Sequence, residues 1–310
     1  MPSALSTSIV ICTYTDERWD CLRQAVSSAR AQRHRPDEVI VVADHNAALL
    51  DRMRAELAGV RTIPNEGPAG LSGARNSGVA AAGGDIVVFL DDDAVARRRW
   101  LETLLDAYDN PTVVGVGGHA EPLWPAGRPG WWPPEFDWVV GCSYRGLPAT
   151  RAPVRNLMGC NMSFRREVLD RVGDFVDGIG RVGDRPLGCE ETELCIRIAR
   201  QMPGARFIYE PGARVFHRVA ESRVTWSYFR RRCLAEGRSK AMVSRRTGSA
   251  DALRTERDHV RRALVHGVRR DVAALVRHRD LDGARRALCS AGGLAAAGAG
   301  FVAGHVGRNR

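Results

Sequence analysis

The nine residues Asp85-Ile86-Val87-Val88-Phe89-Leu90-Asp91-Asp92-Asp93 decide how the rest of this sequence is interpreted. Ile86–Leu90 is a continuous run of β-branched, aromatic and leucine residues, which predicts a strand buried on both faces. The strand delivers three carboxylates to one point, where they repel one another unless a cation neutralises them. A turn or helix cap before Trp100 would account for one aspartate but not for three. We therefore predict a divalent-cation site at Asp91–Asp93.

Strands and helices alternate on the N-terminal side of this stretch. Apolar runs predict strands at 8–12, 38–43 and 60–64, and helical periodicity predicts helices from Trp19 to Ala29, over 46–58 and over 71–82. This order predicts an α/β fold with a Rossmann-like, mostly parallel central sheet flanked by helices. Ligands of such sheets bind beyond the carboxyl ends of the strands. Thr13–Glu17, Asp44 and Asp91–Asp93 should therefore converge on one crevice.

The phosphate-binding loops of nucleotide enzymes are absent from this sequence. No GxGxxG follows the first strand and no GxxxxGK[ST] occurs, so a nucleotide held here must be gripped through a metal. The segment 65–76 is rich in glycine, and its Arg75 offers a bidentate donor for a diphosphate. The alternative is a structural role, in which Arg75 pairs with Asp85 or with an aspartate of the triplet.

Two further features of the sequence carry candidate chemistry. Glu190 and Glu191 fall in or just before the first turn of a helix whose apolar face is set by Leu194 and Ile198. Acidic residues there stabilise the helix dipole, but a carboxylate fixed at that point can also accept a proton. Strands are predicted at 159–164, 205–209 and 213–216, the last two joined by a turn at 210–212. His217 ends the last strand and is a candidate third metal ligand, although a lone histidine is more often structural.

Residues 121–155, the Trp/Pro segment, are irregular and carry seven prolines and four tryptophans, at 124, 131, 132 and 138. The tryptophans argue against disorder. They are suited to stacking on a sugar, to a membrane interface or to covering part of the core, and the core is the default interpretation.

The formal charge of +10 is concentrated in the C-terminal part. Residues 1–222 hold 26 Lys/Arg against 29 Asp/Glu, whereas 223–310 hold 20 against 7. We predict a catalytic domain at 1–222 and a basic, amphipathic helical extension at 223–310, with helices near 251–277 and 280–291. The uncharged segment 287–304 is rich in alanine and glycine, and we expect it to pack on the domain or lie at a membrane surface. The basic extension suggests an anionic partner, although solvated helix faces would explain it equally well.

The cysteines and the N-terminus bear on the compartment. Eight cysteines are scattered without a CxxC pair, which is typical of free thiols in a reducing compartment. No secretory signal pattern opens the sequence. The expected location is the cytoplasm, with peripheral contact at the inner face of the cell membrane through the C-terminal helices.

Taken together, these motifs resemble the family 2 nucleotide-sugar glycosyltransferases, inverting enzymes of the GT-A fold. The matching features, in chain order, are Ser8–Tyr14, Asp44, Gly73-Ala74-Arg75-Asn76, Asp91-Asp92-Asp93, Gly159–Phe164, Glu190-Glu191 and His217. They span about residues 6–220. The resemblance implies a nucleotide-sugar donor, such as a UDP-sugar, and Mn²⁺ or Mg²⁺. The Trp/Pro segment and 229–240 are similar to members that act on polyprenyl-phosphate-linked sugars, and no nucleic-acid partner is expected.

The resemblance also implies roles for single residues. Asp93, Asp91 and His217 are assigned to the metal. The donor nucleotide is assigned to Thr13, Tyr14, Thr15, Glu17, Asp44, Arg75, Asp91 and Asp92. The catalytic base of the family is usually the Asp of a Glu-Asp pair, a position held here by Glu191, with Glu190 as a competitor. Asp44-His45-Asn46 also departs from the family pattern, which leaves the nucleotide base open.

Glu191 would take the proton of an acceptor hydroxyl while the metal neutralises the leaving diphosphate, giving inversion. A natural product or a peptide is the alternative acceptor to a lipid-linked sugar. Outside this class, the rival interpretations are a sugar nucleotidyltransferase and a non-catalytic module that binds membranes or nucleic acid.

Overall fold

The computed structural model describes residues 5–181, 187–248, 259 and 264–306, which belong to two compact units. The first unit takes in the chain up to Glu121, Pro148–Arg185 and Glu190–His217. The second takes in Pro122–Leu147, Pro186–Cys189 and the chain from Arg218 onward. This partition differs from the predicted boundary at 222. Pro122–Leu147, which is most of the Trp/Pro segment, belongs with the C-terminal helices, whereas the end of that segment from Pro148 onward belongs with the sheet.

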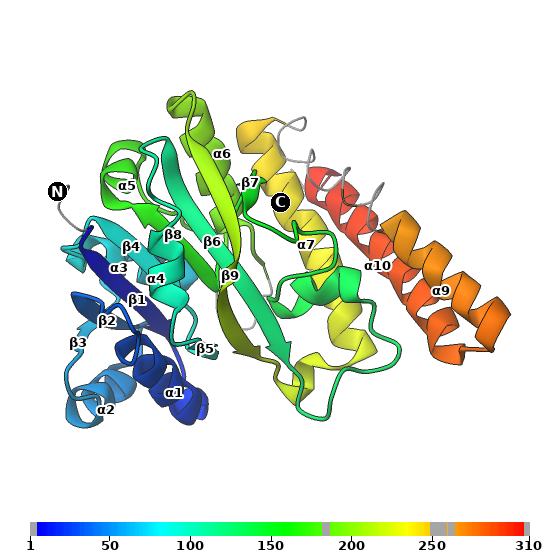
Figure 1. The fold of residues 1–310 in the computed structure, drawn as a ribbon, viewed down its shortest axis with the longest axis horizontal. Helices are drawn as coiled ribbons and strands as arrows, with labels where there is room; N and C mark the ends of the chain where they lie inside the picture. Colours follow the sequence, from blue (N-terminus) through cyan, green and yellow to red (C-terminus); the bar gives the residue numbers. More distant parts are fainter. Residues whose placement is uncertain (1–4, 182–186, 249–258, 260–263, 307–310) are drawn as a thin grey trace. The chain divides into compact units, whose positions relative to one another are not determined.

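A single nine-stranded sheet organises the first unit, in the order β3-β2-β1-β4-β8-β6-β9-β5, with β7 paired to β9 (Figure 1). The strands are β1 Thr7–Thr13, β2 Glu38–Ala43, β3 Arg61–Pro64, β4 Ile86–Leu90, β5 Ala94–Ala96, β6 Val113–Leu123, β7 Ala152–Val154, β8 Asn161–Arg165 and β9 Arg206–Arg218. Strands β1 to β4 pair in parallel. The pairs β4–β8, β6–β8, β5–β9 and β7–β9 are antiparallel. The predicted α/β fold is confirmed, but the sheet is mixed and not mostly parallel.

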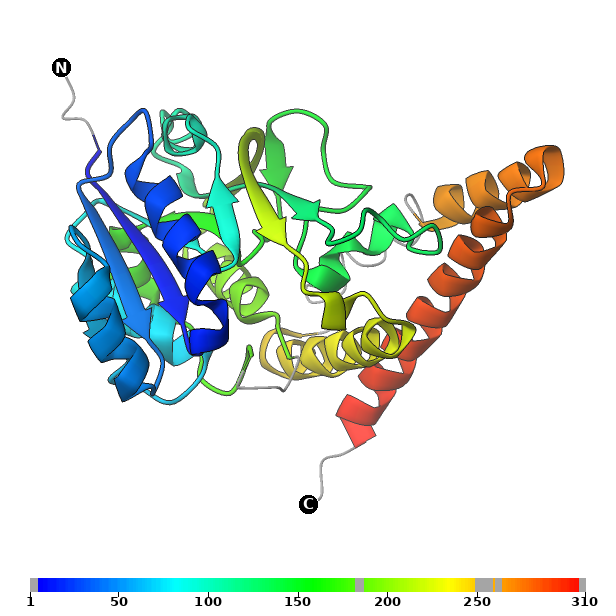
Figure 2. The ribbon, with the colours of Figure 1, turned by 90° about the horizontal axis from the view of Figure 1, so that it is seen from below.

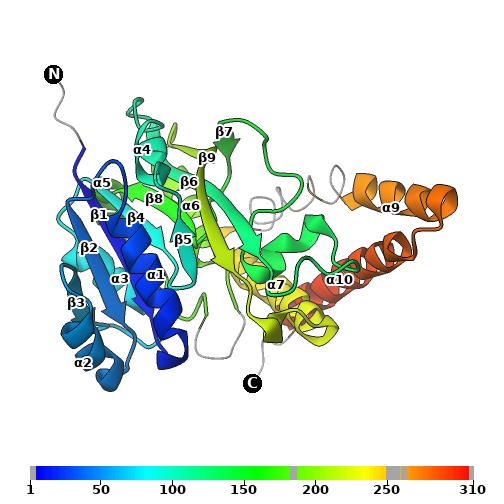
Figure 3. The same cartoon turned by 60° about the horizontal axis from the view of Figure 1, so that its bottom comes forward.

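Helices cover both faces of the sheet, because successive residues of the buried strands point to opposite sides. Ile9 and Ile11 of β1 join the core beneath α1 Trp19–Arg30, α2 Ala47–Glu56 and α4 Trp100–Leu105. Val10 joins the core beneath α3 Leu71–Ala81, α5 Arg166–Val172 and α6 Glu190–Gln201. Figure 3 shows α1 lying along this layer of strands. Apolar runs without alternation, such as β4, are explained by this burial on both sides.

Two parts of the sheet differ from the prediction. The segment 205–216 was predicted as two strands around a turn at Glu210-Pro211-Gly212, but the structure has one continuous strand, β9. Strand β6 was not predicted, because its glycines weaken a strand pattern. A Cβ built on Gly118 would lie 2.0 Å from the carbonyl oxygen of Ala213, so close approach of the backbones requires glycine there.

An aromatic cluster forms the core of the second unit. Trp132, Phe136 and Phe229 are buried in it, and Trp132 is completely inaccessible. Trp124, Trp131 and Trp138 pack around them from the Trp/Pro segment. The centroid of the Phe229 ring lies 5.1 Å from that of Trp132, edge to face, and 5.2 Å from that of Phe136, in a tilted arrangement. The tryptophans therefore cover a core, which was the default interpretation.

The remaining elements of the second unit are η2 Pro134–Val140, η3 Glu221–Arg223, α7 Trp226–Thr247, α9 Val265–His278 and α10 Leu281–Val306. Figure 2 shows α9 and α10 as a hairpin of adjacent helices. The predicted helix 280–291 and the alanine/glycine segment after it are one helix, α10. The predicted helix 251–277 is seen as α9, and 251–258 and 260–263 lie outside the described residues. By length and composition α10 is long and apolar enough to cross a membrane. An 18-residue stretch of this helix has a mean hydropathy of 1.5, and 22% of that stretch is buried.

An ionic group on α7 stabilises the same unit. Arg232 donates to Glu236 over 2.9 Å, and the ammonium of Lys240 lies 3.6 Å from the same carboxylate. Burial raises the pKa of Glu236, but Arg232 and Lys240 outweigh burial and lower the pKa below its usual value. Glu236 therefore stays ionised within the unit.

Candidate active site

The acidic triplet occupies the link between two strands of different direction. Strand β4 ends at Leu90, Asp91–Asp93 follow, and β5 begins at Ala94. Because β5 pairs with β9, Ala94 lies opposite His217. The pairing brings a histidine more than 120 residues away in sequence next to the triplet. A fully buried β4 holds these side chains at a fixed point, as its composition predicts.

Asp91, Asp93 and His217 form a group suited to one cation. Each offers a ligand atom, and the three atoms lie within 4.8 Å of one another. Nε2 of His217 is 3.0 Å from Oδ1 of Asp93 and 3.9 Å from Oδ2 of Asp91. Ligands of an octahedral ion with bonds of about 2.1 Å lie about 3.0 Å apart when adjacent and about 4.2 Å apart when opposite. The two distances from His217 fall in this range, so the group offers two carboxylates and one imidazole that are spaced to hold one divalent cation such as Mn²⁺.

The middle aspartate is held by an arginine that the sequence analysis did not single out. Nη1 of Arg18 donates to Oδ1 of Asp92 over 3.0 Å and lies 3.4 Å from Asp93. Burial and the charge of Asp93 raise the pKa of Asp92 to about 6, although Arg18 opposes this shift. Arg18 lies shortly after the end of β1, and this position was the only feature of the sequence by which its place in the site could have been predicted. The structure places Asp92 in the protein interior, paired with Arg18.

Arg75 lies in the protein interior, only 2% exposed. Its guanidinium donates to Glu190 over 2.7 Å and to the carbonyl of Gly159 over 3.0 Å, and lies 3.5 Å from Asp91. The rings of Phe89 and Phe175 flank it at 5.8 and 5.5 Å. Burial lowers the pKa of Arg75, but Glu190 and Asp91 outweigh burial and raise it above its usual value. The geometry favours the alternative interpretation, in which Arg75 pairs with an aspartate of the triplet, and it adds Glu190 as the nearer partner.

The two glutamates at the start of α6 have different surroundings. Glu190 is 4% exposed and faces Arg75. Glu191 is half-buried and accepts a hydrogen bond from the hydroxyl of Thr192 over 3.2 Å. The structure thus separates a carboxylate used in an interior ion pair from one that solvent reaches.

Five of the residues predicted to bind the donor nucleotide lie at the ends of β1 and β2. Thr13 is buried, Tyr14 and Glu17 are exposed, and Thr15 caps the short helix η1 (Asp16–Arg18) by accepting from the backbone of Glu17. The amide of Asn46 donates to the carbonyl of Tyr14 over 3.2 Å, so the two loops lie side by side.

Asp44 is engaged by the protein in this structure. Its carboxylate accepts from the side chain of Asn65 over 2.6 Å and from the backbone of Gly70 over 2.9 Å. Asn65 follows β3 directly, and its contact with Asp44 was not predicted from the sequence. Asp44 therefore ties the end of β2 to the glycine-rich loop that leads into α3.

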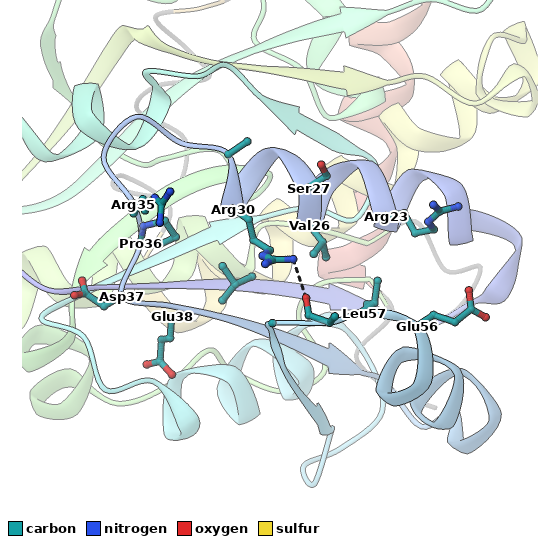
Figure 4. A pocket seen from close by; sticks show the side chains of 14 residues that line it. Arg23, Val26, Ser27, Arg30, Arg35, Pro36, Asp37, Glu38, Glu56 and Leu57 are labelled. Atoms are coloured by element: carbon teal, nitrogen blue, oxygen red, sulfur yellow. Dashed lines mark hydrogen bonds between the residues drawn. The ribbon is translucent and has the colours of Figure 1, made fainter.

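A surface depression of about 700 Å³ lies elsewhere in the first unit (Figure 4). It is lined by residues of α1, by 35–39, which lead into and begin β2, and by 56–59, which precede β3. Arg30 crosses it to reach the carbonyl of Ala58 over 2.8 Å. Since the site residues follow the strands and these residues precede them, the depression is at the opposite end of the sheet from Asp91–Asp93.

Comparison with known proteins agrees with this site. The sequence model of the family described as "Glycosyl transferase family 2" matches residues 8–173. The chain is 37% identical over 243 residues to the glucosyl-dolichyl phosphate glucuronosyltransferase of Haloferax volcanii, covering 77% of each protein. It is 31% identical over 199 residues to the pre-mycofactocin glycosyltransferase of Mycobacterium tuberculosis, covering 63% of this chain and 39% of that protein.

Solved structures share the fold. A mannosyltransferase from Pyrobaculum calidifontis, in complex with GDP-Man and Mn²⁺, gives a TM-score of 0.62 at 18% identity and covers 99% of this chain and 89% of its own. The crystal structure of GalNAc-T7 with UDP, GalNAc and Mn²⁺ gives a TM-score of 0.53 at 17% identity. The match covers 76% of this chain and 48% of the GalNAc-T7 chain. The chain belongs to glycosyl transferase family 2, and the protein is a glycosyltransferase of the GT-A fold. The resemblance inferred from the motifs is confirmed.

Proposed function

We propose that this glycosyltransferase moves a sugar from a nucleotide-sugar, such as a UDP-sugar, to an acceptor hydroxyl with inversion at the anomeric carbon. The observation that carries the proposal is the Asp91, Asp93 and His217 group at the carboxyl end of the buried strand β4. A bound Mn²⁺ or Mg²⁺ would neutralise charge on the leaving diphosphate. The two related folds solved with Mn²⁺ and a nucleotide support this cofactor.

In the proposed reaction Glu191 is the general base. An acceptor oxygen forms a bond to the anomeric carbon as the bond from that carbon to the diphosphate breaks, and an oxygen of Glu191 takes the hydroxyl proton. Attack opposite the leaving group inverts the centre. Partial exposure of Glu191 supports the assignment, because a base must reach its substrate, whereas Glu190 is occupied by Arg75.

The same proposal gives the strand-end loops to the donor. Tyr14, Thr15, Glu17 and Asp44 would contact the nucleoside, and the buried Thr13 would shape the end of β1. Arg75 would act through Asp91 and Glu190, which it holds in place, instead of through direct contact with the diphosphate.

For the acceptor we propose a lipid-linked sugar at the cytoplasmic face of the cell membrane. The name of the Haloferax relative, which specifies a dolichyl phosphate sugar, supports this class. The eight cysteines are free thiols, in keeping with a reducing compartment. A natural-product acceptor is the second candidate, supported by the name of the mycobacterial relative.

A thermal-shift screen of UDP- and GDP-sugars, with and without Mn²⁺, tests the donor and the metal together. We expect one sugar nucleotide to raise the unfolding temperature only when Mn²⁺ is present. Asp93→Asn should lose this response, whereas the matched control Asp20→Asn, whose side chain is 85% exposed on α1, should keep it. Turnover with a polyprenyl-phosphate sugar should then release UDP or GDP. Release of pyrophosphate would contradict the proposal and indicate a nucleotidyltransferase.

A further inference from the structure

The apolar helix α10 is packed in the reverse of the usual sense. Helices of soluble proteins turn large apolar residues inward and small or polar residues outward. On α10 the large residues point outward: Leu281, Leu288, Val302 and Val306 are 66%, 72%, 61% and 76% exposed. They recur at spacings of seven, fourteen and four, which places them on one face of the helix.

The opposite face of α10 consists of small residues that contact α7. A Cβ on Gly300 would lie 2.0 Å from the carbonyl oxygen of Leu234, and one on Gly237 would lie 2.0 Å from that of Ala297. A Cβ on Gly293 would lie 2.7 Å from a ring carbon of Phe136 and 3.0 Å from one of Phe229 in the aromatic core. Gly293 and Gly300 of α10 therefore serve packing within the chain, and the exposed leucines and valines of the other face remain for another partner.

A spanning orientation of α10 conflicts with its neighbour. At 26 residues α10 is about 39 Å long, enough to cross a bilayer. It is packed against α7, however, whose Arg245 donates to the carbonyl of Gly304 and whose Arg232, Glu236 and Lys240 form an ionic group. A spanning α10 would carry these charges into hydrocarbon, which is costly. An orientation in the plane of the interface leaves them in water.

The neighbouring helix α9 supplies positive charge beside a second apolar stripe. Val272 and Val276 are 45% and 76% exposed, and Arg269, Arg277 and Arg279 are exposed near them. Arg270 and Arg286 are instead used internally, in ion pairs with Glu135 and Asp271 that fix the hairpin. Large apolar residues together with exposed arginines match a surface that carries both acyl chains and anionic headgroups.

We propose that the outward face of the α9–α10 hairpin docks on an anionic lipid bilayer, with α10 lying in the interface. Docking would bring the enzyme to the surface where a lipid-linked acceptor lies, and this role rests on the proposed function. The docking itself is argued from the surface of the hairpin alone. The residues that carry it are Leu288 and Val302 on α10 and Arg269 and Arg277 on α9.

Co-sedimentation of the full chain with vesicles, in the absence of donor and acceptor, tests the docking surface. Vesicles of phosphatidylcholine with phosphatidylglycerol should bind the protein, and pure phosphatidylcholine should bind it at least about tenfold more weakly. Leu288→Gln with Val302→Gln should weaken binding by at least about tenfold. The matched control Leu123→Gln changes an apolar residue of 42% exposure on β6 and should bind like the parent chain. Arg269→Gln with Arg277→Gln should weaken binding to anionic vesicles by about fivefold per arginine.

Unchanged vesicle binding in the Leu288→Gln, Val302→Gln variant would overturn the inference. A parent dimer that becomes a monomer in the same variant, measured by sedimentation equilibrium, would assign the face to a second copy of the chain and would also overturn it. The unfolding temperature and its Mn²⁺-dependent shift with donor, which should match those of the parent, show that the variant is folded. Failure of the proposed reaction would appear in that donor response, whereas failure of docking would appear only with vesicles.

Discussion

Replacing Glu190 by Gln and, separately, Glu191 by Gln should separate stability from catalysis at the start of α6. Glu190 accepts from Arg75 over 2.7 Å, and both side chains are at most 5% exposed. Removing one partner of a buried ion pair costs about 3–5 kcal/mol. Gln keeps an oxygen that accepts from Arg75, and Asp91 and Gly159 still contact the guanidinium. We therefore expect Glu190→Gln to lower the free energy of unfolding by about 2 kcal/mol, the difference between charged and neutral hydrogen bonds plus part of the lost pairing.

Glu191→Gln should show the opposite pattern. The side chain is half-buried and accepts a hydrogen bond from the hydroxyl of Thr192, and Gln keeps an oxygen that can accept it, so the free energy of unfolding should change by less than about 0.5 kcal/mol. Loss of a general base should lower kcat by about 10²–10⁴-fold with little change in donor affinity. Urea unfolding followed by circular dichroism gives the stability, and nucleotide release gives kcat.

The charge of Glu190 can be separated from the length of its side chain. Glu190→Asp keeps the charge but shortens the side chain, so it should recover part of the stability that Glu190→Gln loses. If Glu190→Gln abolished turnover without loss of stability while Glu191→Gln remained active, the two roles would be reversed. Equal loss of kcat in both Gln variants with unchanged stability would contradict the assigned ion pair as well.

Three further predictions concern the metal group, the helix crossing and the ionic group of α7. His217→Asn should weaken Mn²⁺ binding by about 10–100-fold in isothermal titration, and unchanged affinity would remove His217 from the ligand set. Gly300→Ala should lower the free energy of unfolding by about 1–3 kcal/mol, whereas Gly298→Ala, with open space around its Cβ, should raise it by up to about 1 kcal/mol; equal effects would refute the close helix packing. Because the pKa of Glu236 is depressed, its stabilisation is complete above about pH 4.5 and is lost as the pH falls through the folded-state pKa. The stability difference between the parent and Glu236→Gln, measured by urea unfolding, should therefore shrink as the pH falls below about 4.5, and a constant difference would contradict the linkage.

The sequence predicted the first half of the sheet because burial alone determines its pattern. Strands β1, β2 and β4 are apolar at nearly every position, and each is covered by helices on both faces. Strand β6 could not be predicted this way, since Gly118 is needed for a contact with Ala213 that lies 95 residues further along the chain. Nor could the course of β9 be predicted, because a Glu-Pro-Gly sequence favours a turn locally while pairing with β5 and β7 keeps the strand extended.

The candidate site was predictable where residues follow strands and unpredictable where long side chains bridge elements. Carboxyl ends of parallel strands meet at one edge, so Thr13, Asp44 and the acidic triplet were expected to converge. The partners of Arg18 and Arg75 depend on tertiary packing, which no local pattern encodes. Arg75 reaches a glutamate 115 residues away, and the sequence alone left its partner open between a diphosphate and nearby aspartates.

The charges of these bridged groups argue for a divalent cation independently of the comparisons. Each arginine contacts two carboxylates: Arg18 contacts Asp92 and Asp93, and Arg75 contacts Asp91 and Glu190. Four carboxylates against two guanidinium groups leave two negative charges, and carboxylates in a partly buried site are destabilised by such an excess. A divalent cation at the Asp91, Asp93 and His217 group would balance them. Arg75 contacts both Asp91, a proposed metal ligand, and Glu190, the residue before the proposed base. The buried guanidinium of Arg75 therefore links the proposed metal site to the start of α6.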